Sequence, residues 1–230
     1  MKYLEAIDPT EFKRPAVMIS RLVPDGAVVL DIGCAGGRVA KLFKDKGCRV
    51  VGVEADPDRA TVAKEVCDEV VIGDIEEPEV MTAIARGFQA IICSDVLEHM
   101  RDPGRVLRAL KEKLVPGGRV YISIPNLLQW RVRWRLLRGE FRYEATGVFD
   151  ETHLRFYSYE SAKELCRSSG YRLVEERFAW DVPFGNRMGA RYRHHPDSFP
   201  RSVVRASEWL AGRRPGLLAG HFVFVLLPES

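Results

Sequence analysis

Residues 29–37 read VLDIGCAGG, and the order of residue types in this stretch indicates the fold of the chain. The apolar run 27–31, rich in β-branched residues, predicts a buried strand that ends on a single acid, Asp31. The glycines that follow predict a tight turn, because glycine lacks a β-carbon and lets other groups approach the backbone. A buried strand followed by such a turn is typical of a chain that presents its backbone to a ligand.

Further along the chain, short apolar runs alternate with segments of helical spacing. An Asp-Pro pair opens two of the expected helices, because aspartate suits the N-cap and proline the first helical position. This alternation predicts parallel βαβ units and a doubly wound α/β fold with helices on both faces of the sheet. The expected strands are 27–31, 49–54, 69–72, 88–93, 119–124, 171–178 and 220–227, and the expected helices include 37–46, 77–86, 103–114 and 158–169, with a turn at 115–118.

Several polar or glycine-rich segments follow the expected strands directly. These are Asp31–Gly37, Glu54, Asp74 and Ser94–His99. Because the carboxyl ends of parallel strands meet at one edge of a sheet, we expect these segments to form a ligand site there.

The composition is that of an ordinary globular protein. Hydrophobic residues make up 46% and charged residues 29%, and a net charge of +3 is too small to indicate a nucleic-acid-binding protein. The five cysteines lack metal-ligand spacing, so we expect reduced thiols, a cytoplasmic protein and no metal site. The start shows no signal-peptide pattern, and the apolar stretch 217–227 is too short for a membrane helix, so we interpret it as a strand buried on both faces.

The glycine turn does not match the motifs that bind phosphate groups. The dinucleotide fingerprint G-x-G-x-x-G is absent from residues 33–37, and no Gly-Lys-Ser/Thr follows them. The turn therefore favours a ligand that contains adenosine but has no phosphates.

Five motifs occur in order along the first half of the chain: VLDIGCAGG (29–37), VVGVEADP (50–57), VVIGDIEE (70–77), IICSDVLEHMRDP (91–103) and LVPGGRVYISIPN (114–126). With them the chain resembles the class I S-adenosylmethionine-dependent methyltransferases, in particular the small-molecule group that includes quinone- and sugar-modifying enzymes. The resemblance covers residues 26–125 in detail and 150–178 more loosely. It implies a mostly parallel seven-stranded sheet whose last strand is antiparallel, with S-adenosyl-L-methionine as cofactor and S-adenosyl-L-homocysteine as product.

The resemblance also implies a role for each motif. Asp31 would orient the ammonium group of the cofactor, directly or through water, and Glu54 would accept hydrogen bonds from the ribose hydroxyls. Asp74 would read the adenine edge with the backbone of Ile75; the less favoured alternative is a turn aspartate that caps the next helix. The expected cofactor-binding residues are Asp31, Gly33, Cys34, Ala35, Gly36, Glu54, Ala55, Asp74, Ile75, Ser94, Asp95 and Leu97. Ala35 departs from the family, which usually has glycine there, so we expect retained binding with shifted geometry.

Two histidines are candidates for the acid–base chemistry of methyl transfer. His153 lies after the fifth expected strand, where acceptors enter this fold, and could be a general base or could bond Asp150 or Glu151 and fix its loop. His99 could face the acceptor or anchor its own loop. Ser94–Leu97 stand in place of the Asn/Asp-Pro-Pro-Tyr/Phe motif of many amino-group methyltransferases, which favours an oxygen or carbon acceptor over nitrogen.

Two basic segments, 126–157 and 180–219, interrupt the alternation. Helical spacing places Arg131, Arg135 and Arg138 on one face, beside two tryptophans. Three interpretations stay open: a surface helix that packs its tryptophans on the domain and leaves its arginines solvated, a lid whose arginines bind an anionic acceptor, or a basic amphipathic helix that rests weakly on a membrane. Aromatic residues among arginines could also bind RNA, but no RNA-binding module accompanies them, so a nucleic-acid partner is the least favoured.

We therefore expect one methyltransferase domain over residues 1–230 that acts on a small, anionic acceptor at oxygen or carbon. Its expected parts are an N-terminal helical segment (1–25), a cofactor-binding core (26–125), cap segments (126–157 and 180–219), and the residues that complete the sheet (158–179 and 220–228). The alternatives are a cofactor-binding protein without catalysis and a methyltransferase associated with a membrane surface or with RNA.

Overall fold

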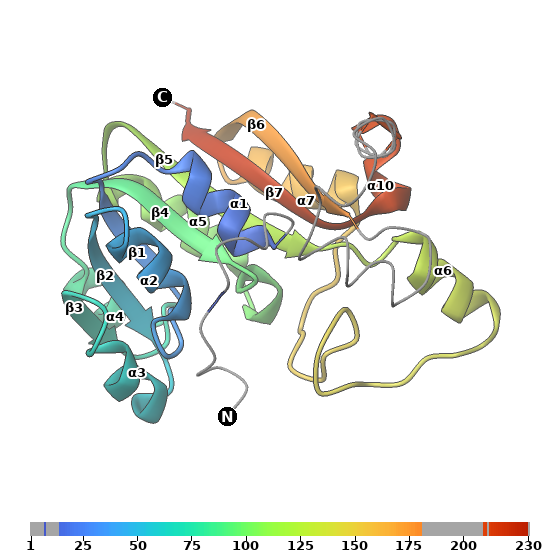
Figure 1. Cartoon of the computed structure of the whole chain (residues 1–230), viewed down its shortest axis with the longest axis horizontal. Helices are drawn as coiled ribbons and strands as arrows, with labels where there is room; N and C mark the ends of the chain where they lie inside the picture. The colour runs from blue at the N-terminus through green and yellow to red at the C-terminus, as the bar shows by residue number, and fades with distance from the viewer. Residues whose placement is uncertain (1–6, 8–13, 181–208, 211, 230) are drawn as a thin grey trace.

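A computed structural model describes residues 7, 14–180, 209–210 and 212–229 of the chain (Figure 1). Its centre is a seven-stranded sheet with strand order β3-β2-β1-β4-β5-β7-β6. All neighbouring strands are parallel except β7, which runs antiparallel to both β5 and β6. The expected seven-stranded sheet with its reversed last strand is confirmed. The strands are β1 Val28–Ile32, β2 Arg49–Glu54, β3 Glu69–Ile72, β4 Phe88–Ser94, β5 Leu114–Pro125, β6 Tyr171–Trp180 and β7 Ala219–Pro228.

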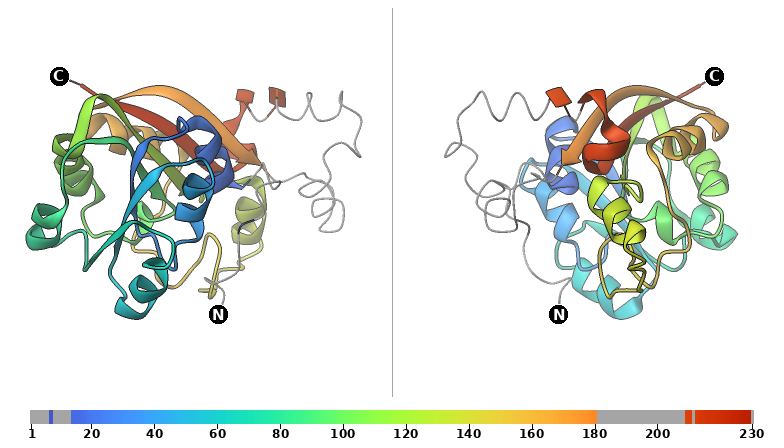
Figure 2. Two further views of the ribbon diagram at one scale, coloured as in Figure 1. Left: turned by 60° about the vertical axis from the view of Figure 1, so that its left-hand side comes forward. Right: turned by 90° about the vertical axis from the view of Figure 1, so that its right-hand side faces the viewer.

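Helices cover both faces of the sheet, as Figure 2 shows. One face packs Ile19, Phe43 and Ala63 against the sheet, from α1, α2 and α3. The other packs Leu107 of α5 and Ala162 of α7. The sheet is therefore buried on both sides, as its almost continuous apolar strands require. The helices are α1 Pro15–Leu22, α2 Arg38–Lys44, α3 Pro57–Ala63, α4 Pro78–Ala83, α5 Pro103–Leu110, α6 Trp130–Leu137, α7 Tyr159–Ser168 and α10 Pro215–Leu218, with 3₁₀ turns η1 Leu97–His99 and η2 Lys111–Lys113.

Three of the described helices begin at a residue whose side chain caps the helix. Asp56 accepts hydrogen bonds from the backbone N–H groups of Asp58 and Arg59, and Asp102 accepts one from Arg105. Ser158 caps α7 in the same way. Each cap satisfies a donor that a helix N-terminus otherwise leaves without a partner, and so fixes where the chain leaves the loop at the carboxyl end of the sheet.

Several boundaries differ from the expectation; the helix expected over 77–86, for example, is Pro78–Ala83. The segment 115–118 is not a free turn but an irregularity within β5, where the pairing with β4 shifts from Phe88↔Leu114 to Ala90↔Arg119. The helix expected over 103–114 ends at Leu110, because η2 and then β5 begin there. Leu217 and Leu218 belong to α10, so only the rest of the apolar stretch 217–227 is strand.

The segment after β5 carries α6 and a long loop that returns to α7 beyond the carboxyl ends of the strands (Figure 1). In the second basic segment, residues 181–208 lie outside the described part of the chain, as do the expected helical residues 1–6 and 8–13. Among the described helices, none combines the length and the apolar character needed to cross a membrane.

Candidate active site

A cavity of about 710 Å³ opens at the carboxyl ends of β1–β4. Its wall combines the loop after β1, the ends of β2 and β3, the segment after β4, and the loop between α6 and α7. Of the residues expected to bind the cofactor, seven line it: Gly33, Ala35, Glu54, Ala55, Asp74, Ile75 and Asp95. His99 and His153 line it as well.

The loop after β1 reaches the cavity through an unusual backbone path. Gly33 (φ +70°) and Ala35 (φ +47°) both adopt left-handed angles. A β-carbon on Gly33 would lie 2.7 Å from Cγ2 of Val96, so glycine is required there by packing as well as by the backbone angle. Cys34 and Gly36 are buried behind this surface and do not line the cavity.

Glu54 is a buried acid at the end of β2 whose two oxygens both accept backbone hydrogen bonds. Oε2 accepts from the N–H of Ala35 at 2.8 Å, and Oε1 accepts from the N–H of Asp56 at 2.9 Å. Each carboxylate oxygen can accept a further bond. Glu54 therefore holds the glycine loop against β2 and still presents acceptors to a ligand in the cavity.

Asp31 is buried at the end of β1, and its Oδ2 has no hydrogen-bond partner among the described residues. Burial, and then the neighbouring charge of Glu54, raises the pKa of Asp31 to about 7. Asp31 does not line the cavity. A cationic group bound beside the loop would favour its charged form, which fits the ammonium group of S-adenosylmethionine.

Asp74 combines both roles that the sequence left open. Its Oδ1 accepts from the N–H of Glu76 at 2.9 Å, which is the bond of a turn aspartate, and the residue also lines the cavity. Ile75 follows it on the same wall.

Of the residues at the end of β4 and just after it, some line the cavity and others lie behind it. Asp95 faces the cavity with φ +53°, and its Oδ1 accepts a 2.6 Å hydrogen bond from Oγ of Ser123. Ser94 lies behind it, 3.1 Å from the same Ser123 hydroxyl. Leu97 is fully buried in the core, so it supports the wall rather than forming it.

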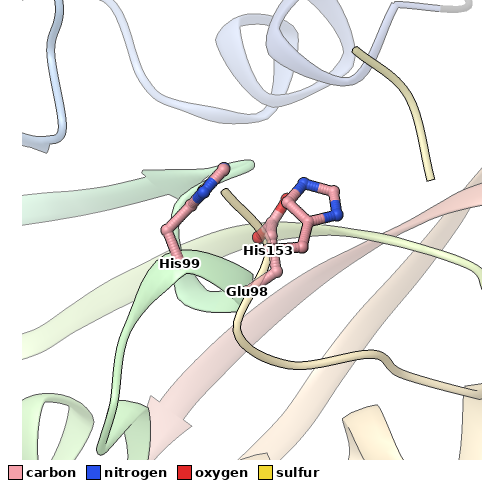
Figure 3. A group of neighbouring side chains, drawn as sticks. All are labelled: Glu98, His99 and His153. Atoms are coloured by element: carbon pink, nitrogen blue, oxygen red, sulfur yellow. The ribbon is translucent and has the colours of Figure 1, made fainter. Parts of the chain in front are cut away.

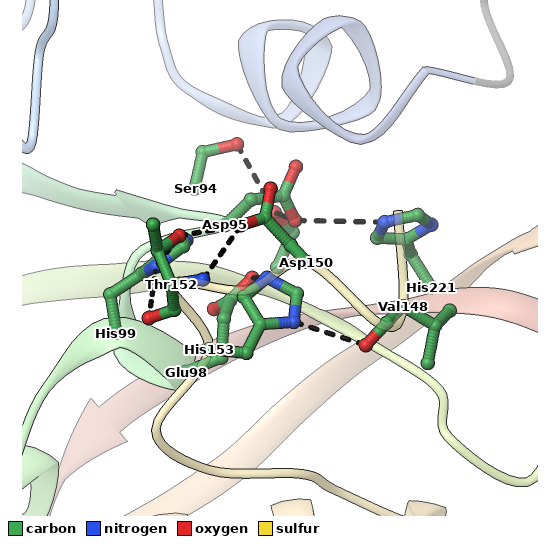
Figure 4. Close-up of polar contacts among 10 residues, drawn as sticks. Ser94, Asp95, Glu98, His99, Val148, Asp150, Thr152, His153 and His221 are labelled. Atoms are coloured by element: carbon green, nitrogen blue, oxygen red, sulfur yellow. Dashed lines mark hydrogen bonds and ion pairs between the residues drawn. The ribbon is translucent and has the colours of Figure 1, made fainter. Parts of the chain in front are cut away.

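His99 and His153 lie side by side on the cavity wall (Figures 3 and 4), and their ring centroids are 4.7 Å apart. Nδ1 of His153 lies 3.1 Å from the carbonyl oxygen of Val148, and Nδ1 of His99 lies 3.1 Å from that of Thr152. Thr152 in turn bonds Asp150. Burial lowers the pKa of His153, so its neutral form is favoured. Both rings are thus tied to the loop between α6 and α7. The ring of His153 bonds Val148, and its backbone N–H donates to the carbonyl oxygen of Asp150 at 3.0 Å.

Glu98 is a buried neighbour of these rings that the sequence did not single out. Its Oε1 lies 3.9 Å from Nε2 of His153, and its Oε2 has no partner among the described residues. Burial, and then the charge of Asp95, raises its pKa well above the usual range. Glu98, His99 and His153 offer three ligand atoms within 4.8 Å of one another, a set that could hold a divalent cation. The expectation of a site without metal stays a prediction.

The three arginines expected to bind the substrate, in α6 and at its C-cap Arg138, do not line this cavity. Arg135 pairs with Glu144 at 2.6 Å and stacks on Phe149, and Arg138 pairs with Glu140 at 2.8 Å. Arg131 lies over the ring of Trp130. The arginines that do line the cavity are Arg14, Arg38, Arg59 and Arg101. The sequence alone could not identify these arginines as neighbours, because they come from four separate parts of the chain.

Comparison with known proteins agrees with this geometry. Residues 10–176 match the family model described as a methyltransferase domain. A ubiquinone biosynthesis O-methyltransferase of Coxiella burnetii is 25% identical over 178 residues, which span 76% of this chain and 75% of that protein. A second ubiquinone biosynthesis O-methyltransferase, from Xanthomonas axonopodis pv. citri, is 33% identical over 129 residues, which span 54% of this chain and 53% of that protein.

Among solved structures, a SAM-dependent methyltransferase from Archaeoglobus fulgidus superposes with a TM-score of 0.65 at 18% identity, covering 98% of this chain and 96% of that one. The fold and the cavity thus define a class I methyltransferase. The chain belongs to the methyltransferase-domain family, and it is an S-adenosylmethionine-dependent methyltransferase.

Proposed function

We propose that this enzyme methylates a hydroxyl oxygen of a small organic acceptor whose reacting end is uncharged. When bound, S-adenosylmethionine supplies a methyl group activated by its positively charged sulfur. The observation that carries the proposal is the group of imidazole and carboxylate side chains that line the cavity together with the glycine loop, where an acceptor would meet the methyl group. The name of the relatives, ubiquinone biosynthesis O-methyltransferase, also supports oxygen as the accepting atom.

Different residues of the cavity would bind the cofactor and meet the acceptor. Glu54, Asp74 and the Gly33–Ala35 loop would hold the cofactor, with Asp31 charged beneath its ammonium group. Most of the catalytic effect would come from placing the acceptor in line with the methyl group and excluding water. A hydroxyl acceptor must also lose a proton, which a nearby imidazole can accept.

The expected negative charge of the acceptor is not supported next to the reacting atom. Asp95 and Asp150 line the acceptor wall, the part of the cavity that carries His99 and His153, and these two acids would repel a carboxylate or phosphate placed against them. The lining arginines come from other parts of the wall, so an anionic group, if the acceptor has one, would point toward them.

A panel of aromatic probes tests the accepting atom. The wild type and Glu54→Gln are incubated with S-adenosylmethionine and catechol, 3,4-dihydroxybenzoate or benzylamine, and methylated products are measured by mass spectrometry. We expect a methyl ether from catechol, less from the dihydroxybenzoate, and none from benzylamine, with strongly reduced product from the variant. Methylation of the amine alone, or of no hydroxyl probe, would contradict the proposal.

A further inference from the structure

His221 is a third histidine on the cavity wall, and the sequence shows it only as an interruption in an apolar strand. It lies near the start of β7, where its neighbours across the sheet are the uncharged Pro125 and Ala179. The next residues, Phe222 and Val223, are fully buried. The side chain of His221 is 36% exposed, so it is accessible from the cavity and not part of the core.

An acid faces His221 from the segment after β4. Oδ1 of Asp95 lies 4.0 Å from Nε2 of His221 (Figure 4). The position of Asp95 is fixed by the hydroxyl of Ser123 and by its own N–H, which donates to the carbonyl oxygen of Ser123 at 3.2 Å. Its left-handed backbone costs about 1 kcal/mol or more, and the surrounding bonds maintain it. Such strain is common where a side chain must be aimed at a site.

The other two histidines of the wall are both bonded to a loop, and His153 is also nearly buried. Each has Nδ1 against a carbonyl oxygen of the loop between α6 and α7. The side chain of His153 is only 7% exposed, and its Nε2 faces Glu98. Of the three rings, His221 combines exposure with a fixed carboxylate 4.0 Å from its Nε2.

We propose that His221 is the general base of methyl transfer and that the carboxylate of Asp95 stabilises its charged form; this inference rests on the proposed hydroxyl acceptor. The acceptor oxygen forms a bond to the methyl carbon while the carbon–sulfur bond breaks and its electron pair stays on sulfur. The hydroxyl proton passes to Nε2 of His221. The resulting imidazolium lies beside the carboxylate of Asp95, which stabilises its charge, and later returns the proton to solvent.

Other titratable groups on the same wall could influence the pH profile. They are Glu98 and His99 of η1 and Asp150 and His153 of the loop between α6 and α7. Among the described residues, β5 and β6 place no charged side chain in register with His221. The assignment of a pH dependence to His221 therefore requires variants of His99 and His153 in parallel.

The test is the pH dependence of kcat with catechol, in the wild type, His221→Gln, His99→Gln and His153→Gln. We expect kcat of His221→Gln to fall by about 10²–10⁴-fold. Its profile should lose the decline on the acidic side that imidazole protonation causes, whereas the other two variants should keep it. Affinity for S-adenosylmethionine, measured by calorimetry, should stay within about twofold, since a general base acts after the cofactor binds.

Two further variants separate catalysis from structure. Imidazole added to His221→Ala should restore part of the rate, which a residue that only packs would not allow. Asp95→Asn should lower kcat, and adding it to His221→Gln should cause little further loss, because the two residues would act as one unit.

The outcomes distinguish this inference from the function on which it rests. If the wild type methylates catechol and His221→Gln keeps kcat or its acidic decline, His221 is not the base and the proposed function stands. If the wild type binds the cofactor but methylates no hydroxyl probe, both proposals are wrong.

Discussion

At the scale of single residues, Asp31 links stability to cofactor binding. It is buried, and one of its oxygens has no partner among the described residues. Its pKa of about 7, against 3.8 in the unfolded chain, means that the folded protein binds this proton more tightly. The contribution of Asp31 to the free energy of unfolding is therefore largest below pH 4 and declines as the pH rises through 7.

Replacement of Asp31 by asparagine should remove that decline. Without cofactor, we expect Asp31→Asn to be more stable than the wild type at pH 8 by on the order of 3 kcal/mol, and the difference to shrink at pH 5. Urea unfolding at the two pH values measures this. If the stability difference between Asp31→Asn and the wild type does not depend on pH, the raised pKa of Asp31 is contradicted. The same variant should bind S-adenosylmethionine about 10- to 100-fold more weakly, as loss of a charged partner implies.

Ala35 provides a second test at this scale, because an alanine occupies a left-handed backbone angle of +47°. Ala35→Gly should raise the free energy of unfolding by about 0.5–1 kcal/mol, since glycine adopts this angle without steric cost. Gly37→Ala is the matched control: its φ is +78°, and the new β-carbon would lie 3.0 Å from Cβ of Val66. We expect that variant to lose at least about 1 kcal/mol in the same denaturant titration. A loss of stability in Ala35→Gly would show that the loop depends on contacts of the alanine methyl.

At the scale of elements, Asn126 joins the end of β5 to the start of β7. Its fully buried side chain donates from Nδ2 to the carbonyl oxygens of Ala219 at 2.7 Å and Gly216 at 3.2 Å. Its Oδ1 accepts from the N–H of Leu128 at 2.9 Å, just before α6. The same side chain thus fixes the strand that carries His221 and the entry to the cap segment.

Asn126→Asp should destabilise the protein more than Asn126→Ala. The aspartate would place a buried charge against carbonyl oxygens, whereas alanine only leaves them without donors, at a cost of about 1–3 kcal/mol. Urea unfolding at pH 7 compares both variants, with Gln129→Ala at the half-buried start of α6 as control. Equal stability of the two Asn126 variants would mean that the side chain does not donate as the structure shows.

Elements with strong periodicity could be predicted from the sequence. Strands such as 49–54 and 69–72 and the three capped helix starts need only local signals, and their positions agree with the structure. The segment 115–118 could not be predicted, because its Pro-Gly-Gly chemistry also suits an irregular strand that pairing with β4 stabilises. The acceptor wall depends on Asp95, Glu98, His153 and His221, which long-range packing brings together from three parts of the chain.

At the scale of the whole molecule, α6 and the loop after it form an exposed surface that is both basic and apolar. The side chains of Trp134 and Leu137 are 58% and 80% exposed, and Phe141 and Tyr143 are also exposed. Arginines 131, 133, 135, 138 and 142 lie in the same stretch. The interpretation of α6 as a helix that packs its tryptophans on the domain does not fit the exposed Trp134. An anionic membrane surface, in contrast, would contact both the exposed apolar side chains and the arginines.

This surface should bind vesicles of phosphatidylglycerol weakly at low salt. We expect flotation of the wild type with these vesicles, little with phosphatidylcholine, and loss of binding near about 0.5 M salt, where charges are screened within a few ångströms. Trp134→Ser combined with Leu137→Ser should reduce flotation, and the exposed Ile72→Ser on β3 serves as control. Binding that resists salt, or that the double variant retains, would contradict this role of α6.

The central claim is that the cavity at the carboxyl ends of the strands binds S-adenosylmethionine through Glu54. Calorimetric titration of S-adenosylmethionine and S-adenosylhomocysteine into the wild type, Glu54→Gln and the exposed control Glu69→Gln tests it directly. We predict binding of both ligands to the wild type and the control, and a loss of about 1.5 kcal/mol or more in Glu54→Gln, since the amide replaces a charged acceptor. Failure of folded wild-type protein to bind either ligand, or equal affinity in Glu54→Gln, would contradict the account.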